Sequence, residues 1–430
     1  GDVTVNSGVT LTVDPGVTVF FEAHRDDQAG GRWSDRAELI IWGTLMAEGT
    51  ATTPIYFTSA ATQTLPGDWG GINVRKNSTQ SSLRYCLIQH AETGVSFRTV
   101  DEGGGALSGT VANCTLRYNA HGLYLYGQPE LNGGGGTVII DPFIANNLIM
   151  SNTMGMELRT TSGYGVTQNY ARVQNNILRD NETGMQIRGN TWWEGHADNY
   201  PEIVNNTFVD NTSSSLNILA SGSSDGSGSD SDVRPTVENN LFDSTAVTTT
   251  TTHIYLYLDP FGSDGTQILS PTLRYNTIRN ADVGILVEDT QSYDTLNPTI
   301  SHNVFYGFGS GTLAIDNQTG RTITATHNYW GQTEAAWDAG APSSLINGTV
   351  VVTDHLTSLS PPVVSRVTPG AAQPGDPMTI HGANFDVTPP VIWFHQDQLA
   401  YPGLIGAVEM TSTVAPLATD GDVMAEMYDG

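Results

Sequence analysis

An asparagine-rich unit that recurs along the chain constrains the fold more than any other feature of this sequence. Residues 145–159 contain a pair of Asn residues, a short apolar strand, an Asn five residues after the pair, then Gly and an alternating strand. The same order returns in residues 173–188. Because self-similarity at a nearly fixed period is typical of repeat architectures, we interpret the chain as a repeat protein.

The second residue of each pair gives a register that can be followed along most of the chain. Successive reference positions are 25 to 36 residues apart, whereas a Gly stands eight residues after most of them. The reference positions are Cys86, Cys114, Asn147, Asn176, Asn206, Asn240, Asn276, Asn303 and Asn328. The glycines are Gly94, Gly122, Gly155, Gly184, Gly284 and Gly311, and a second Asn row consists of Asn119, Asn152, Asn181 and Asn211. Variable steps with constant local spacing place insertions in loops at fixed corners.

Steps this short leave no room for helices between the strands, so the strands are expected to stack as coils ~4.8 Å apart. Like residues then superpose, and Asn side chains bond along the stack as a ladder. Asn tolerates the left-handed backbone of one corner and Gly that of the next. We therefore predict an all-β fold, a right-handed parallel β-helix of roughly ten or eleven coils, with an Asn ladder from Asn147 to Asn328.

The alternation after each corner glycine assigns residues to the inside and outside of the helix. The inward residues are Val95, Phe97, Leu123, Leu125, Met156, Leu158, Met185, Ile187, Ile285 and Val287. One outward column contains Ser96, Tyr124, Glu157, Gln186 and Leu286, and the next contains Arg98, Tyr126, Arg159, Arg188 and Glu288.

The Asn period stops after residue 331, and a bridging segment with one further strand at 348–353 follows. Pro361 and Pro362 mark a boundary. We predict residues 1–360 as the β-helix, including the bridging segment 332–360, and residues 361–430 as a small immunoglobulin-like β-sandwich.

Two resemblances to known families support this division. The motifs GVTLTVDPG (8–16), PIYFTS (54–59), DWGGI (68–72) and NYWG (328–331) resemble secreted right-handed β-helix repeat proteins of the pectate-lyase-like superfamily over about residues 1–355. VSRVTPG (364–370) with residues 374–385 resembles the opening of TIG/IPT immunoglobulin-like domains. The resemblances imply a secreted or cell-surface protein whose last domain is a spacer or interaction module.

The charge balance excludes several partners. The net charge is −27, and Lys76 is the only lysine among 17 basic residues. We therefore expect no nucleic-acid partner, since nucleic-acid binding relies on neutralising phosphates.

No apolar run approaches the ~20 residues that span a bilayer, so we expect no membrane insertion.

The two cysteines occupy the same corner of successive coils. Their Cα atoms are then expected about 5 Å apart, within disulfide range. Cys86 and Cys114 either form a disulfide in an oxidising compartment or replace two ladder Asn residues as buried thiols.

The superfamily resemblance brings an enzyme hypothesis. It implies lyases that hold calcium with clustered Asp or Glu and use Arg or Lys as the base, or hydrolases with close Asp residues and a Gly-His pair. Neither pattern is found. The arginines of the outward column lie near Glu157 but beside no cluster of acidic residues, and Asp26 and Asp27 lie in a loop (22–36) far from this column. The Gly195-His196 pair has no pair of acidic residues nearby in the coil register. We interpret the Arg–Glu stripe as a solvated, self-compensating surface and predict no catalytic residue.

Exposed aromatic residues favour binding. They are Tyr124, Tyr126, Trp192, Trp193, Tyr255 and Tyr257. Rings at such positions are covered by the same chain, bind another protein or stack on a glycan.

The sequence predicts no metal site or cofactor. Asp225, Asp230 and Asp232 are the candidates for calcium, but their spacing does not match an EF-hand loop, so we favour a solvated loop. His302 and His327 replace the first Asn of two late pairs, which favours a structural role.

A β-helix exposes unpaired strands at its ends. We therefore predict a non-catalytic extracellular structural protein that self-associates head to tail, through the helix end and the TIG-like module, into a filament or lattice, or that acts in adhesion. The alternatives are a carbohydrate-active lyase or hydrolase and a glycan-binding adhesin.

Overall fold

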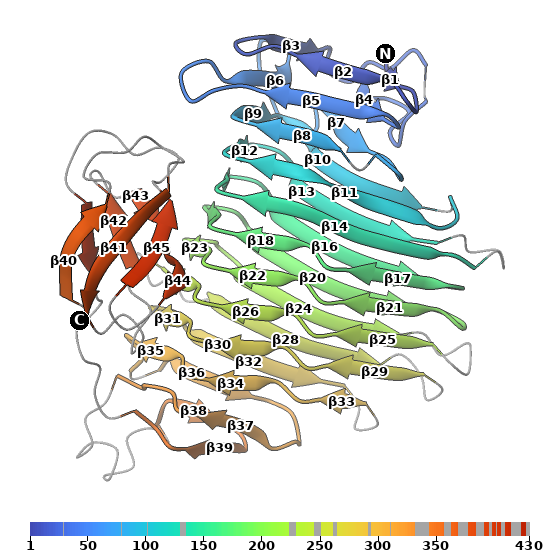
Figure 1. Ribbon diagram of the computed structural model, residues 1–430. Helices are drawn as coiled ribbons and strands as arrows, with labels where there is room; N and C mark the ends of the chain where they lie inside the picture. Colours follow the sequence, from blue (N-terminus) through green and yellow to red (C-terminus); the bar gives the residue numbers. More distant parts are fainter. Residues whose placement is uncertain are drawn as a thin grey trace.

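The computed structural model describes the β-helix with a few gaps and the strands of the C-terminal region. The described ranges are 1–28, 30–78, 80–100, 102–129, 135–222, 229–244, 251–260, 265–290, 294–309, 311–331 and 344–356, followed by the strands between 363 and 426. In these residues the regular secondary structure is β-strand, and parallel pairing joins the strands of the rod into three long sheets (Figure 1). The predicted all-β parallel β-helix is confirmed.

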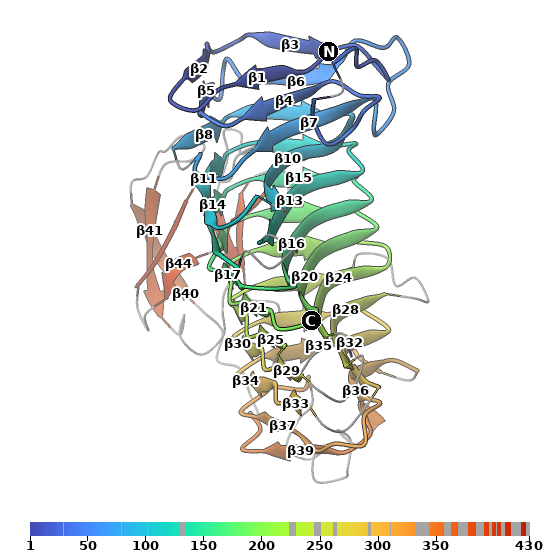
Figure 2. The ribbon, with the colours of Figure 1, turned by 90° about the vertical axis from the view of Figure 1, so that its right-hand side faces the viewer.

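Sheet A has 12 strands and runs the length of the rod (Figure 2). Its strands are β1 (Val3–Val5), β4 (Glu38–Ile41), β7 (Trp69–Val74), β10 (Ala91–Val100), β13 (His121–Gln128), β16 (Met154–Ser162), β20 (Thr183–Thr191), β24 (Ser214–Gly222), β28 (Thr252–Pro260), β32 (Val283–Asp289), β36 (Leu313–Asn317) and β38 (Ile346–Asn347). The strands from β10 to β32 have 7 to 10 residues each, so sheet A gives the middle of the rod one broad outer face.

Sheet B follows sheet A in each coil and is split into two short strands per coil after β14. Its strands are β2 (Thr10–Val13), β5 (Thr44–Glu48), β8 (Ser81–Arg84), β11 (Gly105–Ala112), β14 (Thr137–Ala145), β17 (Val166–Asn169), β18 (Arg172–Gln174), β21 (His196–Asn199), β22 (Glu202–Val204), β25 (Asp230–Val233), β26 (Thr236–Glu238), β29 (Thr266–Leu269), β30 (Thr272–Arg274), β33 (Thr295–Leu296), β34 (Thr299–Ser301), β37 (Ile323–Thr326) and β39 (Val350–Thr353).

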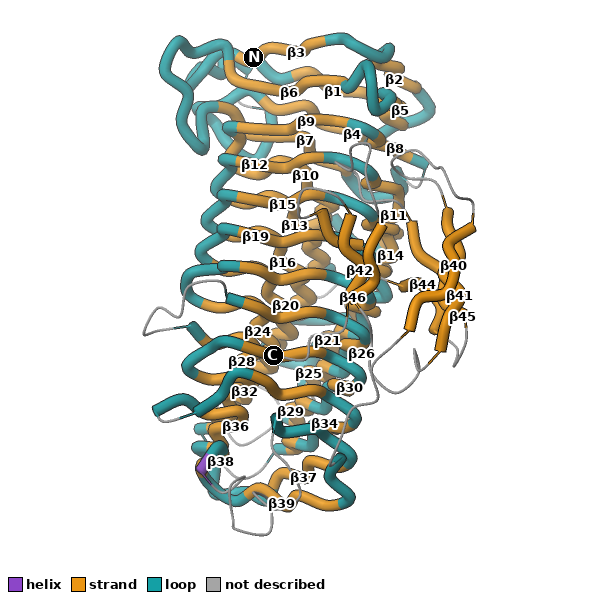
Figure 3. The backbone as a smooth tube through the Cα atoms, turned by 90° about the vertical axis from the view of Figure 1, so that its left-hand side faces the viewer, coloured by secondary structure: helices purple, strands orange, loops and turns teal. Residues whose placement is uncertain are grey.

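Sheet C closes each coil with a short strand (Figure 3). Its strands are β3 (Thr18–Phe21), β6 (Ile55–Ser59), β9 (Cys86–Gln89), β12 (Thr115–Arg117), β15 (Leu148–Met150), β19 (Ile177–Arg179), β23 (Thr207–Val209), β27 (Leu241–Asp243), β31 (Thr277–Arg279) and β35 (Val304–Tyr306).

The inside of the rod is one continuous hydrophobic core. All ten residues predicted to point inward after the corner glycines are fully buried in it. Equivalent positions stack from coil to coil; the Phe208 and Phe242 rings, for example, lie 4.7 Å apart and nearly parallel. Each coil alone has too little apolar surface to fold, so the stacking itself stabilises the strands.

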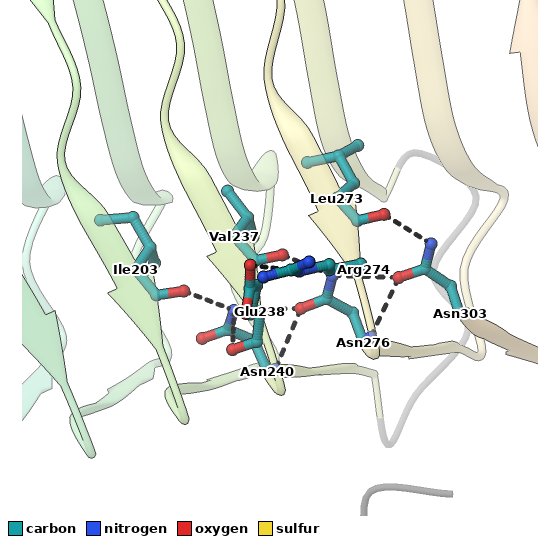
Figure 4. Close-up of polar contacts among 8 residues, drawn as sticks. All are labelled: Ile203, Val237, Glu238, Asn240, Leu273, Arg274, Asn276 and Asn303. Carbon is teal, nitrogen blue, oxygen red and sulfur yellow. Dashed lines mark hydrogen bonds and ion pairs between the residues drawn. The ribbon is translucent and has the colours of Figure 1, made fainter. Parts of the chain in front are cut away.

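The corner between sheets B and C carries the predicted Asn ladder (Figure 4). Asn240 shows the pattern: its backbone N–H and its Nδ2 both donate to Asn276 Oδ1 at 3.0 Å. The same Nδ2 also donates to Ile203 O at 2.8 Å and to Glu238 O at 2.9 Å. The pattern runs from Asn147 to Asn328, and a second ladder joins Asn119, Asn152, Asn181 and Asn211.

Gly311 has the predicted left-handed backbone, with φ of 90°, but the other five corner glycines have a different role from the predicted one. Left-handed backbone falls on the residue before each ladder Asn, as at Asn146 and Asn175 with φ of 57°. Gly155, in contrast, is not left-handed; a Cβ there would lie 2.3 Å from Gly184 O in the next coil. The glycine is therefore required by the close approach of neighbouring coils.

Cys86 and Cys114 are free buried thiols, so the structure has the second of the two alternatives and not the disulfide. The Cys86 N–H points to Cys114 Sγ at 3.4 Å, and the Cys114 N–H donates to Asn147 Oδ1 at 2.9 Å. The sulfur atoms thus continue the ladder with a weaker acceptor.

The bridging segment adds to the rod, because β39 pairs in parallel with β37. The C-terminal strands form two antiparallel sheets: β40 (Val363–Thr368), β41 (Pro377–Ala383), β45 (Glu409–Thr413) and β44 (Pro402–Ile405) in one, and β43 (Gln398–Ala400), β42 (Val391–Phe394) and β46 (Val423–Glu426) in the other. The immunoglobulin-like assignment stays a prediction. In the described part of the chain there is no helix long and apolar enough to cross a membrane.

Candidate functional site

The outer face of sheet A presents two columns of side chains from β10 to β32. The register of the parallel pairs fixes them: the first column holds Ser96, Tyr124, Glu157, Gln186, Asn217, Tyr255 and Leu286, and the second holds Arg98, Tyr126, Arg159, Arg188, Leu219, Tyr257 and Glu288. The predicted columns are confirmed, and Asn217, Leu219 and the two late tyrosines extend them.

Three arginines of the second column are half-buried, and the part of the chain that the structure describes offers them no carboxylate partner. Nε of Arg98 and Nε of Arg188 are buried without a hydrogen-bond partner among the described residues. Arg159 Nε donates to a neutral group, Thr161 Oγ1, at 3.2 Å. The interpretation of a solvated, self-compensating Arg–Glu stripe is therefore corrected: the three arginines are half-buried and form no ion pair with a described carboxylate, although the charge of Glu157 raises the pKa of Arg188.

The arginines also repel one another. Burial lowers the pKa of Arg98, and the nearby charge of Arg32 lowers it further. Burial and the charge of Arg159 lower the pKa of Arg188 in the same way. Burial, assisted by Arg98, lowers the pKa of Arg75 to about 10. In a chain of net charge −27, this face concentrates positive charge that an anion would stabilise.

Tyrosine pairs interrupt the arginines. The rings of Tyr124 and Tyr126 lie 5.5 Å apart at 24°, and both residues are buried, at 5% and 9% exposure. Arg98 and Arg159 place their Cζ atoms 5.8 and 5.1 Å from the Tyr126 ring.

A second pair lies further along the same face. The half-buried rings of Tyr255 and Tyr257 stack at 5.6 Å, and the Tyr255 hydroxyl donates to Glu288 Oε2 at 2.6 Å. The four tyrosines thus form two aromatic platforms, one among the arginines and one beside acids.

The loop of residues 22–36 reaches this face, although the sequence analysis placed it far away. Arg32 Cζ lies 4.6 Å from the Trp33 ring and 5.6 Å from the Tyr124 ring. Arg36 of the same loop forms an ion pair with Glu92 of β10. Arg32, Trp33 and Arg36 were not predicted as site residues, because the sequence shows the length of the loop but not the coil on which it packs.

His121, Tyr124 and Glu157 form a cluster at the edge of the arginines. His121 Nε2 lies 3.7 Å from Glu157 Oε2, and the rings of His121 and Tyr124 are 5.9 Å apart. Gln186 Nε2 donates to the other oxygen of Glu157 at 3.4 Å. His121 was also missed, because it precedes the corner glycine, outside the alternating strand that defined the columns.

The pKa values of His121 and Tyr124 are shifted in opposite directions. Burial lowers the pKa of His121, opposed by the charge of Glu157. Burial raises the pKa of Tyr124, and the charge of Glu157 adds to the effect. The imidazole is then neutral near pH 7 and the phenol stays protonated.

Four glutamates lie on strands of sheet A: Glu38 on β4, Glu92 on β10, Glu157 on β16 and Glu288 on β32. Glu92 is two strands, or about 10 Å, from Glu38 and from Glu157, whereas Glu157 and Glu288 are four strands, or about 19 Å, apart. Two carboxylates that hydrolyse a glycosidic bond stand ~5–9.5 Å apart. Glu157 and Glu288 therefore do not form such a pair, whereas Asp259 and Glu288 lie on neighbouring strands beside Tyr257.

The outer face of sheet B carries an acidic patch around His196, although the sequence predicted no acidic residues beside the Gly195-His196 pair. His196 and Asp230 are register partners, with Nδ1 and Oδ2 3.3 Å apart, and Asp198 lies opposite Asp232. Tyr200 donates to Asp232 Oδ2 at 2.9 Å. The Gly195-His196 pair thus has acidic neighbours, which the loop 221–232 had hidden in the sequence.

Asp225, the third calcium candidate, lies outside the described residues. Among the described residues there is no group of three or more His, Cys, Asp or Glu side chains arranged to hold a metal ion. The absence of a metal site stays a prediction, with calcium at the loop as its alternative.

The remaining candidates occupy corners. Trp193 is 37% exposed and stacks on Tyr164 at 5.3 Å, while Trp192 is half-buried. His302 and His327 stack at 4.9 Å in left-handed conformation.

Comparisons with known proteins found one family model and several solved structures. Residues 1–134 match a family described as a pectate-lyase like beta helix domain. No curated protein matches. Similar solved structures include a double mutant of the tailspike protein of E. coli bacteriophage HK620, at 11% identity and a TM-score of 0.32 over 97% of this chain and 85% of that chain. Another double mutant of that tailspike, in complex with a pentasaccharide, has 10% identity and a TM-score of 0.27 over 99% and 85%.

These findings contradict the prediction of a non-catalytic assembly protein and the prediction that the protein is not an enzyme. The family matched over residues 1–134 is described as pectate-lyase like, which agrees better with the carbohydrate-active alternative. Self-association is not tested by a single chain and stays a prediction.

Proposed function

We propose that this protein is a carbohydrate-active enzyme that binds an acidic polysaccharide along the outer face of sheet A. The observation that carries the proposal is the group of three half-buried arginines, Arg98, Arg159 and Arg188, which have no carboxylate partner among the described residues. Guanidinium groups pair with carboxylates in a bidentate geometry. Tyr124 and Tyr126 are buried, whereas the half-buried rings of Tyr255 and Tyr257 can pack against the apolar faces of sugars. The arginines and this second tyrosine pair together fit a glycan that carries carboxylates.

The dimensions suit an extended chain. Arg98 on β10 and Arg188 on β20 are three strands apart, which corresponds to about 14 Å. Tyr255 and Tyr257 continue the same columns on β28, two strands beyond Arg188. A polysaccharide that follows the rod axis would therefore meet the basic platform first and the tyrosine platform next.

Calorimetric binding to an acidic polysaccharide and to the same polymer with its carboxylates reduced to alcohols tests the proposal. We expect binding to the acidic polymer and at least about tenfold weaker binding to the reduced one. Arg98→Gln and Arg188→Gln are each expected to weaken binding by about ten- to a hundredfold, since a hydrogen bond to a charged group contributes ~1.5–3 kcal/mol.

The matched control is Arg172→Gln, on sheet B, where Arg172 is exposed and pairs loosely with Asp141. This variant should bind like the wild type. Equal affinity for the two polymers, or no effect of the Arg98 and Arg188 replacements, would contradict the proposal.

We also propose that the protein acts outside the cell and that residues 361–430 are a TIG/IPT-like module. The motifs between 364 and 385 support the module, and the two antiparallel sheets of that region are compatible with it. Expression of residues 361–430 alone, followed by circular dichroism and thermal unfolding, tests it; an unfolded fragment would contradict it.

A further inference from the structure

We propose that Cys86 and Cys114 form a binding site for one soft metal ion of the Cu(I) class, held between their two sulfur atoms at the corner between sheets B and C. The inference goes beyond the proposed function and does not depend on it, because the pair lies in the core of the rod and not on the outer face of sheet A. It replaces the sequence-based expectation that the protein has no metal site.

The two sulfur atoms occupy equivalent positions in neighbouring coils. Each Sγ contacts one carbonyl oxygen two residues earlier in its own coil and one carbonyl oxygen in the preceding coil. These distances are 3.4 and 3.4 Å for Cys86, and 3.3 and 3.5 Å for Cys114. Because the two side chains have the same orientation, their sulfur atoms are separated by about the spacing of adjacent strands, ~4.8 Å.

This separation suits a bridging ion better than a disulfide. A disulfide needs Cβ atoms ~3.5–4.5 Å apart, whereas equivalent atoms of adjacent coils are ~4.8 Å apart. Bonds from thiolates to zinc are ~2.3 Å long, so an ion of similar size between two thiolates spans about 4.6 Å. Soft thiolate ligands select Cu(I), and two thiolates on opposite sides suffice to hold this ion.

The hydrogen bonds of the corner do not require sulfur. Asn176 Nδ2 donates at 3.0 Å to Ile144 O and to Gln174 O, which are the same two carbonyl positions that each thiol contacts. An amide therefore fits this position and bonds more strongly than a thiol, which is a weak donor and a weak acceptor. The chain has two cysteines, and they stand at neighbouring ladder positions, where two thiols can share one ligand.

A hollow of about 390 Å³ beside β6, β9, β12 and β15 gives a path to the pair. Both cysteines line this hollow, and so does Met150, whose thioether is a further soft group. Cys86 is 2% exposed and Cys114 is 1% exposed. A bare ion is much smaller than an organic thiol reagent, so it needs only a slight opening of this wall to reach the sulfur atoms.

Binding exchanges protons for the ion without any oxidation or reduction. The contact with Cys114 and burial raise the pKa of Cys86, so this thiol keeps its proton while no metal is bound. One Cu(I) forms two Cu–S bonds, both S–H bonds break, and the two protons go to solvent. The occupied site then carries one net negative charge, and the Cys86 N–H, 3.4 Å from Cys114 Sγ, donates to it.

The test titrates the full chain with Cu(I) in the absence of oxygen, in competition with a coloured Cu(I) chelator. We expect one ion per chain and the release of two protons per ion. Cys86→Asn and Cys114→Asn each supply the amide of the ladder, so each should abolish this binding while thermal unfolding shows no loss of stability. The control Met46→Leu removes a half-buried thioether of β5 and should bind Cu(I) like the wild type.

X-ray absorption at the copper edge gives a second readout that needs no variant. Two sulfur ligands are expected, and a spectrum with nitrogen or oxygen ligands alone overturns the proposal. Unchanged binding by both Asn variants overturns it too, as does the absence of titratable thiols in the unfolded wild-type chain, which would show a disulfide. If an Asn variant does not fold, Cys86→Ser takes its place, with the same loss of binding expected.

Discussion

Replacement of Asn206 by Ala tests the ladder that holds the coils together. Asn206 Oδ1 accepts the backbone N–H of Asn176 at 2.9 Å and its Nδ2 at 3.0 Å. Asn206 Nδ2 donates to Val173 O at 2.9 Å, to Val204 O at 3.1 Å and to Asn240 Oδ1 at 3.1 Å. Alanine removes all five hydrogen bonds at a fully buried position.

The magnitude follows from these contacts. Five lost hydrogen bonds at about 1 kcal/mol each would lower the free energy of unfolding by about 5 kcal/mol. One buried N–H left without a partner, at ~1–3 kcal/mol, together with the lost packing gives a similar loss, so we expect about 3–5 kcal/mol. Asn206→Cys should lose less, because a thiol at this position still accepts the neighbouring N–H, as Cys114 does for Cys86. Asn217→Ala on the same coil is the control: Asn217 Oδ1 has no partner, so the change should stay within about 0.5 kcal/mol.

Urea unfolding by circular dichroism measures the global loss, and amide hydrogen exchange at Asn176 measures the local one. The second assay is needed because stacked repeats need not unfold in a single step. Exchange at Asn176 should accelerate by a hundredfold or more, since ~3 kcal/mol corresponds to roughly two orders of magnitude. If Asn206→Ala proves as stable as Asn217→Ala and its Asn176 amide stays protected, the reasoning is refuted.

Three further predictions concern buried groups. Burial lowers the pKa of His253 to about 4. The imidazole of the unfolded chain takes up a proton near pH 6.5, so the contribution of His253 to stability should be fully present above that pH and should fall by about 3 kcal/mol as the pH drops to 4. In urea titrations at a series of pH values, His253→Asn should make the free energy of unfolding less dependent on pH. The thiols of Cys86 and Cys114 are buried, and burial together with the Cys114 contact raises the pKa of Cys86, so a thiol reagent should label both only on unfolding; rapid labelling of the native protein would contradict the free, buried pair. Asp243→Ala leaves Arg279, which is 1% exposed and pairs with Asp243 at 2.7 Å, without this partner, and should cost about 3–5 kcal/mol in thermal unfolding; a loss below about 1 kcal/mol would show that the pair contributes little.

The sequence was sufficient for the coil. The corner Asn, the alternating strand after it and the glycine lie within about a dozen residues of one another, and local backbone sterics with side-chain alternation decide where each points. This is why the inward residues, the outward columns and both ladders were predicted. Even here the glycine at position 155 was misread, since its role lies in contact with the next coil and not in its own φ.

The chemistry of the outer face depended on the tertiary structure. Arg32 comes from a loop near the N-terminus and reaches Tyr124, and His121 contacts Glu157 of the neighbouring coil. Which charges neutralise one another depends on rotamers, burial and the course of long loops, and none of these is periodic. The sequence by itself determined a rod of stacked strands, because repetition fixes the backbone; only the packed structure decided which arginines remain unpaired, because desolvation and contacts between distant segments act on side chains one at a time.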